Sequence, residues 1–182
     1  MNRISGIEKS QAPWHLRWFY TTMRKMFGKD LTPVKQQMRV PGMVWGSIAM
    51  EAGLGRKRKV SLRFIQLAKV RTASRVGCPF LVDINSAVGR KAGLTDEKLQ
   101  AVVKNDLLVF SDVEKLVIEL ADAMANTPSN ISDELYARLR EKFSEEQLLQ
   151  LGGQIAFENY RARLNRVFDV GTDELYHPEK TA

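Results

Sequence analysis

Signals that start and stop helices recur along the whole chain, and they constrain the fold more than any other feature. Ser111 and Ser144 are each followed, three residues later, by Glu or Gln. This spacing is that of a capping box, in which two side chains satisfy the free amides at a helix start. Gly28, Gly55 and Gly93 each follow a helical pattern and are expected to end it in a left-handed conformation. The chain is therefore predicted to be helical nearly throughout.

Apolar residues at helical spacing lie between these signals, and no run with the alternation of a strand competes with them. The joins between helices are short, and 182 residues are enough for one core. We therefore predict an all-α helical bundle, with a single domain at 13–175 and frayed tails at 1–12 and 176–182. The predicted helices lie at 13–27, 33–53, 57–77, 79–92, 96–104, 112–126, 131–142 and 145–168.

Charge is divided unevenly between the two parts of the chain. Residues 1–75 hold 16 Lys and Arg and three acids, whereas residues 76–182 hold 12 Lys and Arg and 18 acids. The basic front part thus carries +13 and the acidic rear part −6. Parts of opposite sign attract one another within a chain or between subunits, so the net charge of +7 does not by itself indicate nucleic acid.

The basic run Gly55-Arg56-Lys57-Arg58-Lys59 falls at a predicted helix start, where the helix dipole disfavours cations. A solvated loop and a phosphate-binding segment are alternatives for this run. The unfavourable dipole indicates instead an acidic partner, such as the acidic rear part of a neighbouring subunit.

Residues 14–27 form a basic aromatic segment that suits either an anionic membrane surface or docking against the core or a subunit. Docking is preferred, because no lipidation motif accompanies the segment. No signal peptide is visible, and the longest uncharged stretch, 40–50, is too short to span a bilayer. The lone Cys78 excludes an intrachain disulfide and suits a reducing compartment. A cytoplasmic location is expected, and membrane and nucleic-acid partners are not.

The segment from residue 66 to residue 95 carries most of the chemistry. Its order resembles the carboxymuconolactone decarboxylase family, in its alkylhydroperoxidase-D-like branch, and the likeness extends over almost the whole chain. Members carry an acid on one helix, then Cys-x-x-Cys twelve residues later, then His or Asn four residues after the second Cys. The matching residues here are Gln66, Gly77-Cys78, Asp83, Asn85, Ser86-Ala87 and Ala92-Gly93-Leu94-Thr95.

The chain departs from the family pattern where the chemistry is done. Leu81 stands at the second Cys position, Asn85 at the His position and Gln66 at the acid position. Amides hydrogen-bond but do not exchange protons near neutral pH, and Leu neither attacks nor resolves. The two-cysteine peroxidase cycle is therefore not possible within one chain. His15 and His177 lie near the chain ends, so they supply neither an acid–base pair nor metal-ligand spacing, and no metal or cofactor is predicted.

Cys78 is the candidate catalytic thiol. It is expected at a helix N-terminus, where the dipole lowers a thiol pKa, and Arg71 and Arg75 would add to that effect. The alternative is an inert buried cysteine, and we favour it because cysteine is among the most often buried residues.

Gln66, Asp83 and Asn85 are expected to hydrogen-bond a polar ligand in the pocket that the resemblance implies. For Gln66 and Asn85, hydrogen bonds to each other or to the backbone are an equal alternative. The resemblance also implies a homo-oligomer, whether dimer, trimer or hexamer, and a small peroxide or organic ligand. Two functions stay open. One is a peroxidase-type, antioxidant oxidoreductase that uses Cys78 with an external or inter-subunit resolving thiol. The other is a non-catalytic or altered-ligand member that keeps the fold.

Overall fold

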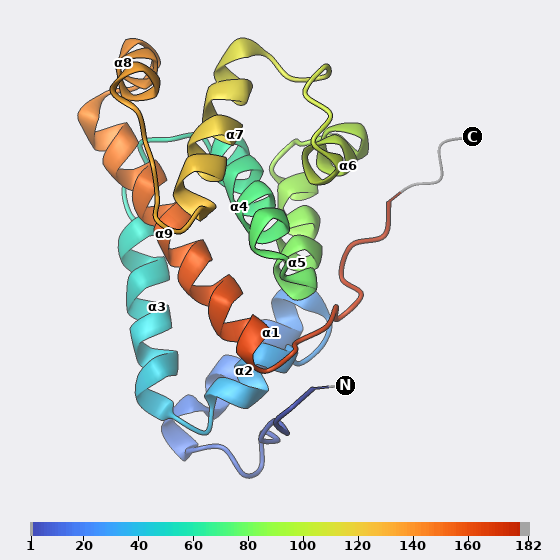
Figure 1. The fold of residues 1–182 in the computed structure, drawn as a ribbon. Coiled ribbons are helices and arrows are strands. Elements are labelled where there is room, and N and C mark those ends of the chain that lie inside the picture. Colours follow the sequence, from blue (N-terminus) through green and yellow to red (C-terminus); the bar gives the residue numbers. More distant parts are fainter. Residues whose placement is uncertain (1, 179–182) are drawn as a thin grey trace.

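The computed structural model describes residues 2–178, and its regular elements over that range are all helices (Figure 1). The predicted all-α fold is confirmed. In chain order the elements are η1 (Trp14–Leu16), α1 (Arg17–Phe27), α2 (Thr32–Gln37), α3 (Pro41–Gly55), α4 (Leu62–Val76), α5 (Pro79–Lys91), α6 (Asp96–Lys104), α7 (Asp112–Ala125), α8 (Asp133–Lys142) and α9 (Glu145–Val167).

Helix α4 is the centre of the bundle. Its residues from Ile65 to Ala73 are all buried, and it packs against α5, α6, α7 and α9 (Figure 1). Most of the apolar core lies around α4 and is completed by Val117, Ile118, Leu151 and Ile155 of α7 and α9. Because α4 is buried on all sides, a polar residue on it must find a partner or face a cavity.

The predicted caps mostly hold. Ser111 and Ser144 both form complete capping boxes, at the starts of α7 and α9. Gly28 and Gly93 adopt positive φ angles of 79° and 91° after α1 and α5, as expected. The prediction for Gly55 is wrong: it is the last residue of α3, and the next residue leaves the helix in an extended conformation.

Two predicted helix boundaries are wrong. The helix predicted at 33–53 is split into α2 and α3, because Pro41 lacks the amide hydrogen that would continue the first helix and takes the first position of the second. The helix predicted from residue 57 begins instead at Leu62. Its N-cap is Ser61, whose hydroxyl accepts a hydrogen bond from the amide of Phe64.

Residues 56–59 of the basic run therefore lie outside a helix, and Lys59 has an acidic partner within the same chain. Lys59 pairs with Glu146 at 2.9 Å. Other ion pairs that join the basic front part to the acidic rear part are Arg63–Glu114 (2.9 Å), Arg71–Asp122 (2.5 Å) and Arg75–Asp122 (3.5 Å). The oppositely charged parts thus form ion pairs with each other within one chain.

The chain ends are attached to the bundle over the range that the structure describes. The amide of Ile7 donates to the carbonyl of Lys35 at 2.8 Å, and Arg3 donates likewise to Phe168 at 3.0 Å. Near the other end, the amide of Tyr176 is bound by a buried carboxylate on α5. The expectation of frayed tails is wrong at the residues that make these contacts, Arg3, Ile7 and Tyr176, while residues 1 and 179–182 lie outside the described range.

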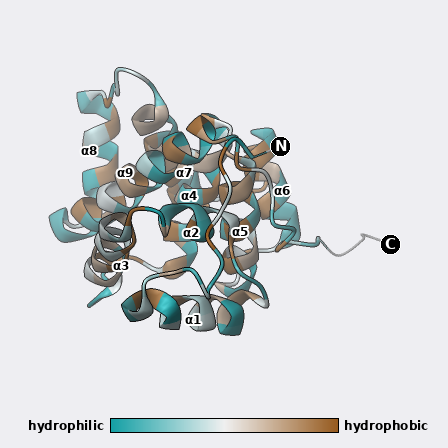
Figure 2. Cartoon of the chain, turned by 90° about the horizontal axis from the view of Figure 1, so that it is seen from below, coloured by the Kyte–Doolittle hydropathy of each residue, from teal (hydrophilic) through white to brown (hydrophobic). Residues whose placement is uncertain are grey.

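The aromatic segment at 14–27 docks by one face only. Leu16 and Tyr20 are buried, whereas Trp14 is 82% exposed. Seen from below, α1 lies across this end of the molecule with α3 and α5 to either side, and both α1 and α3 carry brown, hydrophobic stretches (Figure 2). His15 stacks on Trp45 of α3 with ring centroids 6.2 Å apart. Among the described helices, none has the length and apolar character needed to cross a membrane.

Candidate functional site

A cavity of about 480 Å³ lies among α1, α2, α3, α4, α5 and α9. Figure 2 shows this group of helices from the end at which α1 and α2 sit. The cavity wall is mainly aliphatic and aromatic. Its apolar lining includes Phe19, Met23, Phe27, Leu31, Val34, Val44, Ile48, Phe80, Leu81, Ile84 and Val88.

Polar side chains from four helices also line the cavity. Glu51 comes from α3, Gln66 and Lys69 from α4, Asn85 from α5 and Arg161 from α9. Gln66 and Lys69 are one helical turn apart, so they lie side by side on the same face of the buried helix. Both are only 5% exposed. A buried pocket with apolar walls and a few convergent polar groups is typical of a small-molecule site.

The charged groups form a network that continues into the core. Glu158 of α9 is fully buried and accepts a 2.5 Å hydrogen bond from the side-chain amide of Asn85. Arg161 donates to Glu158 and to Glu51. Lys69 Nζ lies 3.6 Å from Glu51 Oε1, which is longer than an ordinary hydrogen bond. The formal charges of the two cations, Lys69 and Arg161, and the two carboxylates, Glu51 and Glu158, therefore sum to zero.

Burial and neighbouring charges change the protonation of this network. Burial, with the nearby positive charge of Arg161, lowers the pKa of Lys69 against the opposing effect of the carboxylates. Burial alone would raise the pKa of Glu51, but Lys69 and Arg161 outweigh it and lower that pKa. The site thus holds an ionised carboxylate beside an amine that gives up its proton more readily than an exposed lysine.

Some polar atoms at the cavity lack protein partners. The acceptor Gln66 Oε1 and the donor Arg161 Nε are buried and have no hydrogen-bond partner among the described residues. Buried polar atoms are nearly always paired, so an unpaired amide oxygen on a residue of the cavity lining is an acceptor that a ligand or water could complete once the side chain turns toward it. The cavity therefore offers a hydrogen-bond acceptor at Gln66 beside the donor at Lys69.

Cys78 is not part of the cavity lining. Its side chain is 1% exposed, and Asn165, which does line the cavity, donates to its sulfur at 3.7 Å. Burial raises the pKa of the Cys78 thiol despite lowering contributions from Asn165 and the amides of the first helical turn. Arg71 and Arg75 point instead to Asp122. The expected lowering of this pKa is therefore wrong, because desolvation outweighs the hydrogen bonds to the sulfur.

The structure brings three of the five predicted site residues together and leaves Cys78 and Asp83 outside the cavity lining. Gln66, Leu81 and Asn85 all line the cavity. Asp83 faces away from it. Its carboxylate accepts hydrogen bonds from the hydroxyl of Thr172 and from the backbone amides of residues 173, 175 and 176. The expectation that Asp83 lines a pocket is wrong, since it fixes the C-terminal segment to α5.

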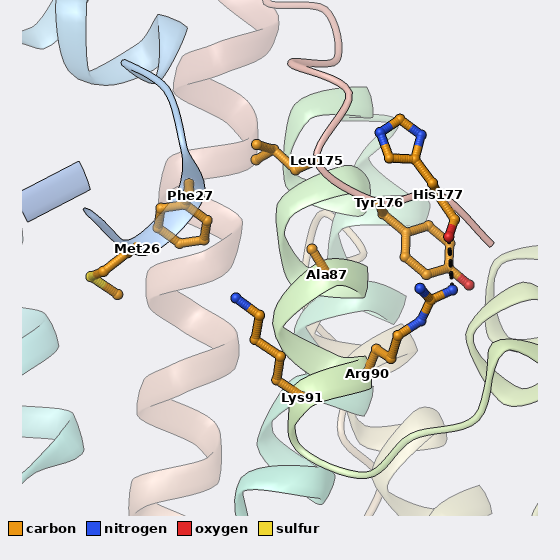
Figure 3. A pocket seen from close by; sticks show the side chains of 8 residues that line it. All are labelled: Met26, Phe27, Ala87, Arg90, Lys91, Leu175, Tyr176 and His177. Carbon is orange, nitrogen blue, oxygen red and sulfur yellow. Dashed lines mark hydrogen bonds between the residues drawn. The ribbon is translucent and has the colours of Figure 1, made fainter. Parts of the chain in front are cut away.

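A second hollow, of about 330 Å³, lies where that C-terminal segment passes α5 (Figure 3). Arg90 sits 4.9 Å from the ring centre of Tyr176 and donates to the carbonyl of His177 at 2.9 Å. Arg90 and the Tyr176 hydroxyl also bind Asp96. Because these groups satisfy one another, the hollow has the character of a packing crevice.

Sequence reasoning missed the charged members of the site: Glu51, Lys69, Glu158 and Arg161. One signal was present on α9, where Leu151 and Ile155 form an apolar stripe that Glu158 continues at helical spacing. A carboxylate in line with a buried stripe needs a buried partner. Which residues supply that partner depends on α3, α4 and α5, which no local pattern relates to α9.

No family model matches the chain. The protein YnjA of Escherichia coli strain K12, described as uncharacterized, is 32% identical over 175 residues, which cover 94% of this chain and 96% of YnjA. This relationship spans both the basic front part and the acidic rear part.

Solved structures share the fold at lower identity. The alkylhydroperoxidase AhpD core of an uncharacterized peroxidase-related protein from Ralstonia eutropha JMP134 matches with a TM-score of 0.88, at 16% identity and 98% coverage of both chains. The debrominase Bmp8, as a cysteine-to-alanine variant in complex with 2,3,4-tribromopyrrole, matches with a TM-score of 0.81, at 15% identity, covering 93% of this chain and 91% of Bmp8. At these identities the likeness shows the fold.

Proposed function

Because the chain belongs to the family of the Escherichia coli protein YnjA and has the alkylhydroperoxidase AhpD-like fold, we propose that it binds a small, largely apolar organic molecule in the cavity between α1 and α9. The bound molecule meets the polar groups of α4 at one end. In this proposal the protein is an altered-ligand member of its fold and does not run a two-cysteine peroxidase cycle.

One observation carries the proposal: the lining of a mainly apolar cavity includes a residue with an unpaired amide oxygen and a buried amine. Gln66 Oε1 has no partner among the described residues, and the carboxylate oxygen paired with Lys69 Nζ is 3.6 Å away, while both residues line the same cavity. Leaving such groups unpaired costs free energy, about 1–3 kcal/mol for each neutral group. A ligand with an apolar body and one polar end would recover that cost.

The position of the thiol supports the same conclusion. Cys78 is buried outside the cavity lining, and Leu81 presents an aliphatic side chain where a second thiol would face the ligand. The AhpD-like fold itself is compatible with an aromatic ligand, since the Bmp8 structure is a complex with 2,3,4-tribromopyrrole.

The proposal is tested by titrating the protein with benzyl alcohol, an aromatic probe with one hydroxyl, and following binding by calorimetry. A Ser47→Trp variant fills the cavity from α3, because Ser47 is part of the lining. Ala49→Trp, on an exposed position of the same helix, is the matched control. Saturable binding to the wild type and to A49W that is lost in S47W supports the proposal. Equal binding by all three proteins, or by none, contradicts it.

A second candidate function, a single-thiol peroxidase, rests on the surroundings of the Cys78 sulfur. Asn165 donates to the sulfur, and the amides of Phe80 and Leu81 act in the same direction on its pKa. Such donors would stabilise a thiolate once it formed. An external thiol would then have to resolve the sulfenic acid.

Turnover of cumene hydroperoxide with dithiothreitol as reductant separates the two functions. A peroxidase activity abolished by Cys78→Ser would favour the second function. Absence of turnover, together with saturable probe binding, would leave the ligand-binding proposal alone.

A further inference from the structure

The amine of Lys69 is placed unlike that of a structural lysine. Lys98, by comparison, donates to both oxygens of Glu114, at 2.8 and 2.6 Å. Lys69 is 5% exposed, yet its nearest carboxylate oxygen is 3.6 Å away, and its side chain lines the cavity. A buried amine that is held only by one long ion pair can also bind a molecule in the cavity.

From this placement we propose that Lys69 is a reactive amine that forms an imine with small, uncharged, largely apolar aldehydes or ketones bound in the cavity. The inference rests on the proposed function and names the class of ligand that this cavity takes. Lysines become nucleophilic when they are desolvated in an apolar pocket or lie beside another cation. Both conditions hold here, because Arg161 is the neighbouring cation.

Charge balance selects an uncharged ligand. With Lys69 protonated, the cluster of Glu51, Lys69, Glu158 and Arg161 is neutral. A carboxylate or phosphate ligand would add an uncompensated negative charge next to Glu51 in a mostly apolar cavity, which is costly. A neutral carbonyl adds no charge, and a protonated imine keeps the positive charge at the place where Lys69 carried it.

The neighbouring groups provide the proton transfers. Glu51 Oε1, 3.6 Å from Nζ, accepts the proton that frees the amine. The nitrogen lone pair attacks the carbonyl carbon as the C=O π electrons move to oxygen, which takes up that first proton from Glu51. The nitrogen of the adduct then gives a second proton to Glu51, which leaves a neutral carbinolamine. Glu51 returns this second proton to the hydroxyl, which departs as water while the nitrogen lone pair forms the C=N bond of a protonated imine. No electron is gained or lost, and the reverse reaction releases the carbonyl compound.

Gln66 provides a hydrogen-bond acceptor near the amine of Lys69. Its unpaired Oε1 lies one turn from Lys69 on α4. This oxygen can accept a hydrogen bond from the hydroxyl of the carbinolamine, which neither the free aldehyde nor the imine carries. The pair of residues therefore favours the intermediate over the ground state.

The experiment incubates the intact protein with benzaldehyde and sodium cyanoborohydride, which reduces the imine to a stable amine, and maps the adduct by peptide mass spectrometry. The expected result is an adduct at Lys69 that is lost in Lys69→Arg, which keeps the charge but cannot form this imine. Lys98→Arg is the matched control and should leave the adduct unchanged. If K69R does not fold, the Ser47→Trp variant and competition by benzyl alcohol each provide a second test, because both should suppress the adduct.

The outcomes separate this inference from the proposed function. Labelling confined to exposed lysines such as Lys59, with benzyl alcohol still bound in the cavity, would overturn the inference and leave the proposed function standing. Absence of both labelling at Lys69 and probe binding would overturn both.

Discussion

The side-chain amide of Asn85 on α5 donates a 2.5 Å hydrogen bond to the fully buried carboxylate of Glu158 on α9. Asn85 stands where the family pattern places His or Asn, and it cannot take up a proton near neutral pH. The carboxylate that Asn85 binds therefore comes from α9, whereas the acid position on α4 holds Gln66. Asn85 holds that carboxylate in place and does not relay a proton.

Glu158→Gln should lower the free energy of unfolding by about 3–5 kcal/mol, because it leaves Arg161 buried with only Glu51 to balance it. Chemical denaturation at neutral pH measures the change. Glu145→Gln, at a residue whose side chain is 82% exposed, is the control and should leave stability nearly unchanged. Equal effects of the two substitutions would mean that the buried network does not stabilise the fold.

Asp83→Asn should loosen the C-terminal segment without opening the bundle. The carboxylate accepts hydrogen bonds from the amides of Leu175 and Tyr176, and an Asn side chain offers only one acceptor oxygen. Hydrogen exchange should accelerate at these amides and stay unchanged in α4. Asp112→Asn, at an exposed carboxylate of α7, serves as the control. Unchanged exchange at residues 173–176 would contradict the assignment of Asp83 as an anchor.

Cys78 should destabilise the protein at alkaline pH. Burial raises its pKa in the folded state, so between the unfolded and folded pKa values the folded chain holds a proton that the unfolded chain has lost. Stability from this group is therefore complete below the ordinary thiol range and declines as pH rises through it. The difference in unfolding free energy between wild type and Cys78→Ser should shrink above about pH 8.5. A difference that grows with pH would indicate a stabilised thiolate.

Leu81→Cys should create a thiol that faces the cavity, because Leu81 lines it whereas Cys78 does not. The new thiol should react with cumene hydroperoxide to give a sulfenic acid and the alcohol, and Cys78 should then displace water to form a disulfide. Counting free thiols before and after peroxide measures this reaction. The same count on wild type, where Cys78 is buried, should stay constant. Loss of the thiol in wild type would show that Cys78 is reached without the second cysteine.

The sequence predicted local structure better than it predicted the site. Capping boxes at Ser111 and Ser144 depend on residues three apart, so they could be read directly. The break at Pro41 was present in the sequence, but it competed with an apolar pattern that continues across it. The site is different in kind, because it depends on which residues four separate helices bring together.

Asp83 and Glu158 illustrate that limit. Both are carboxylates on helices next to the cavity, and the family resemblance drew attention to Asp83 alone. Only the packing of α9 against α4 turns Glu158 inward, while the path of residues 172–176 draws Asp83 outward. The spacing of residues along a helix showed which of them share a face. It did not show which other helix or segment packs against that face.

Lys69→Met tests whether the buried amine is kept at a cost in stability. Burial and Arg161 lower the pKa of Lys69, with Glu51 and Glu158 acting in the opposite direction. Between the folded and unfolded pKa values, the unfolded chain holds a proton that the folded chain lacks, so this group adds stability as pH rises. The unfolding free energy of wild type minus that of K69M should therefore increase as pH approaches the ordinary lysine value of 10.5, because other groups titrate alike in both proteins. At neutral pH, K69M should be as stable as wild type or more so, since Glu51 keeps its pairing with Arg161.

Denaturant titrations from pH 7 to pH 10 measure the difference, with Lys98→Met as the control for a well-paired lysine. A difference that stays flat over this range, or a clear loss of stability in K69M at neutral pH, would mean that Lys69 is a structural cation and not a residue held ready for a ligand.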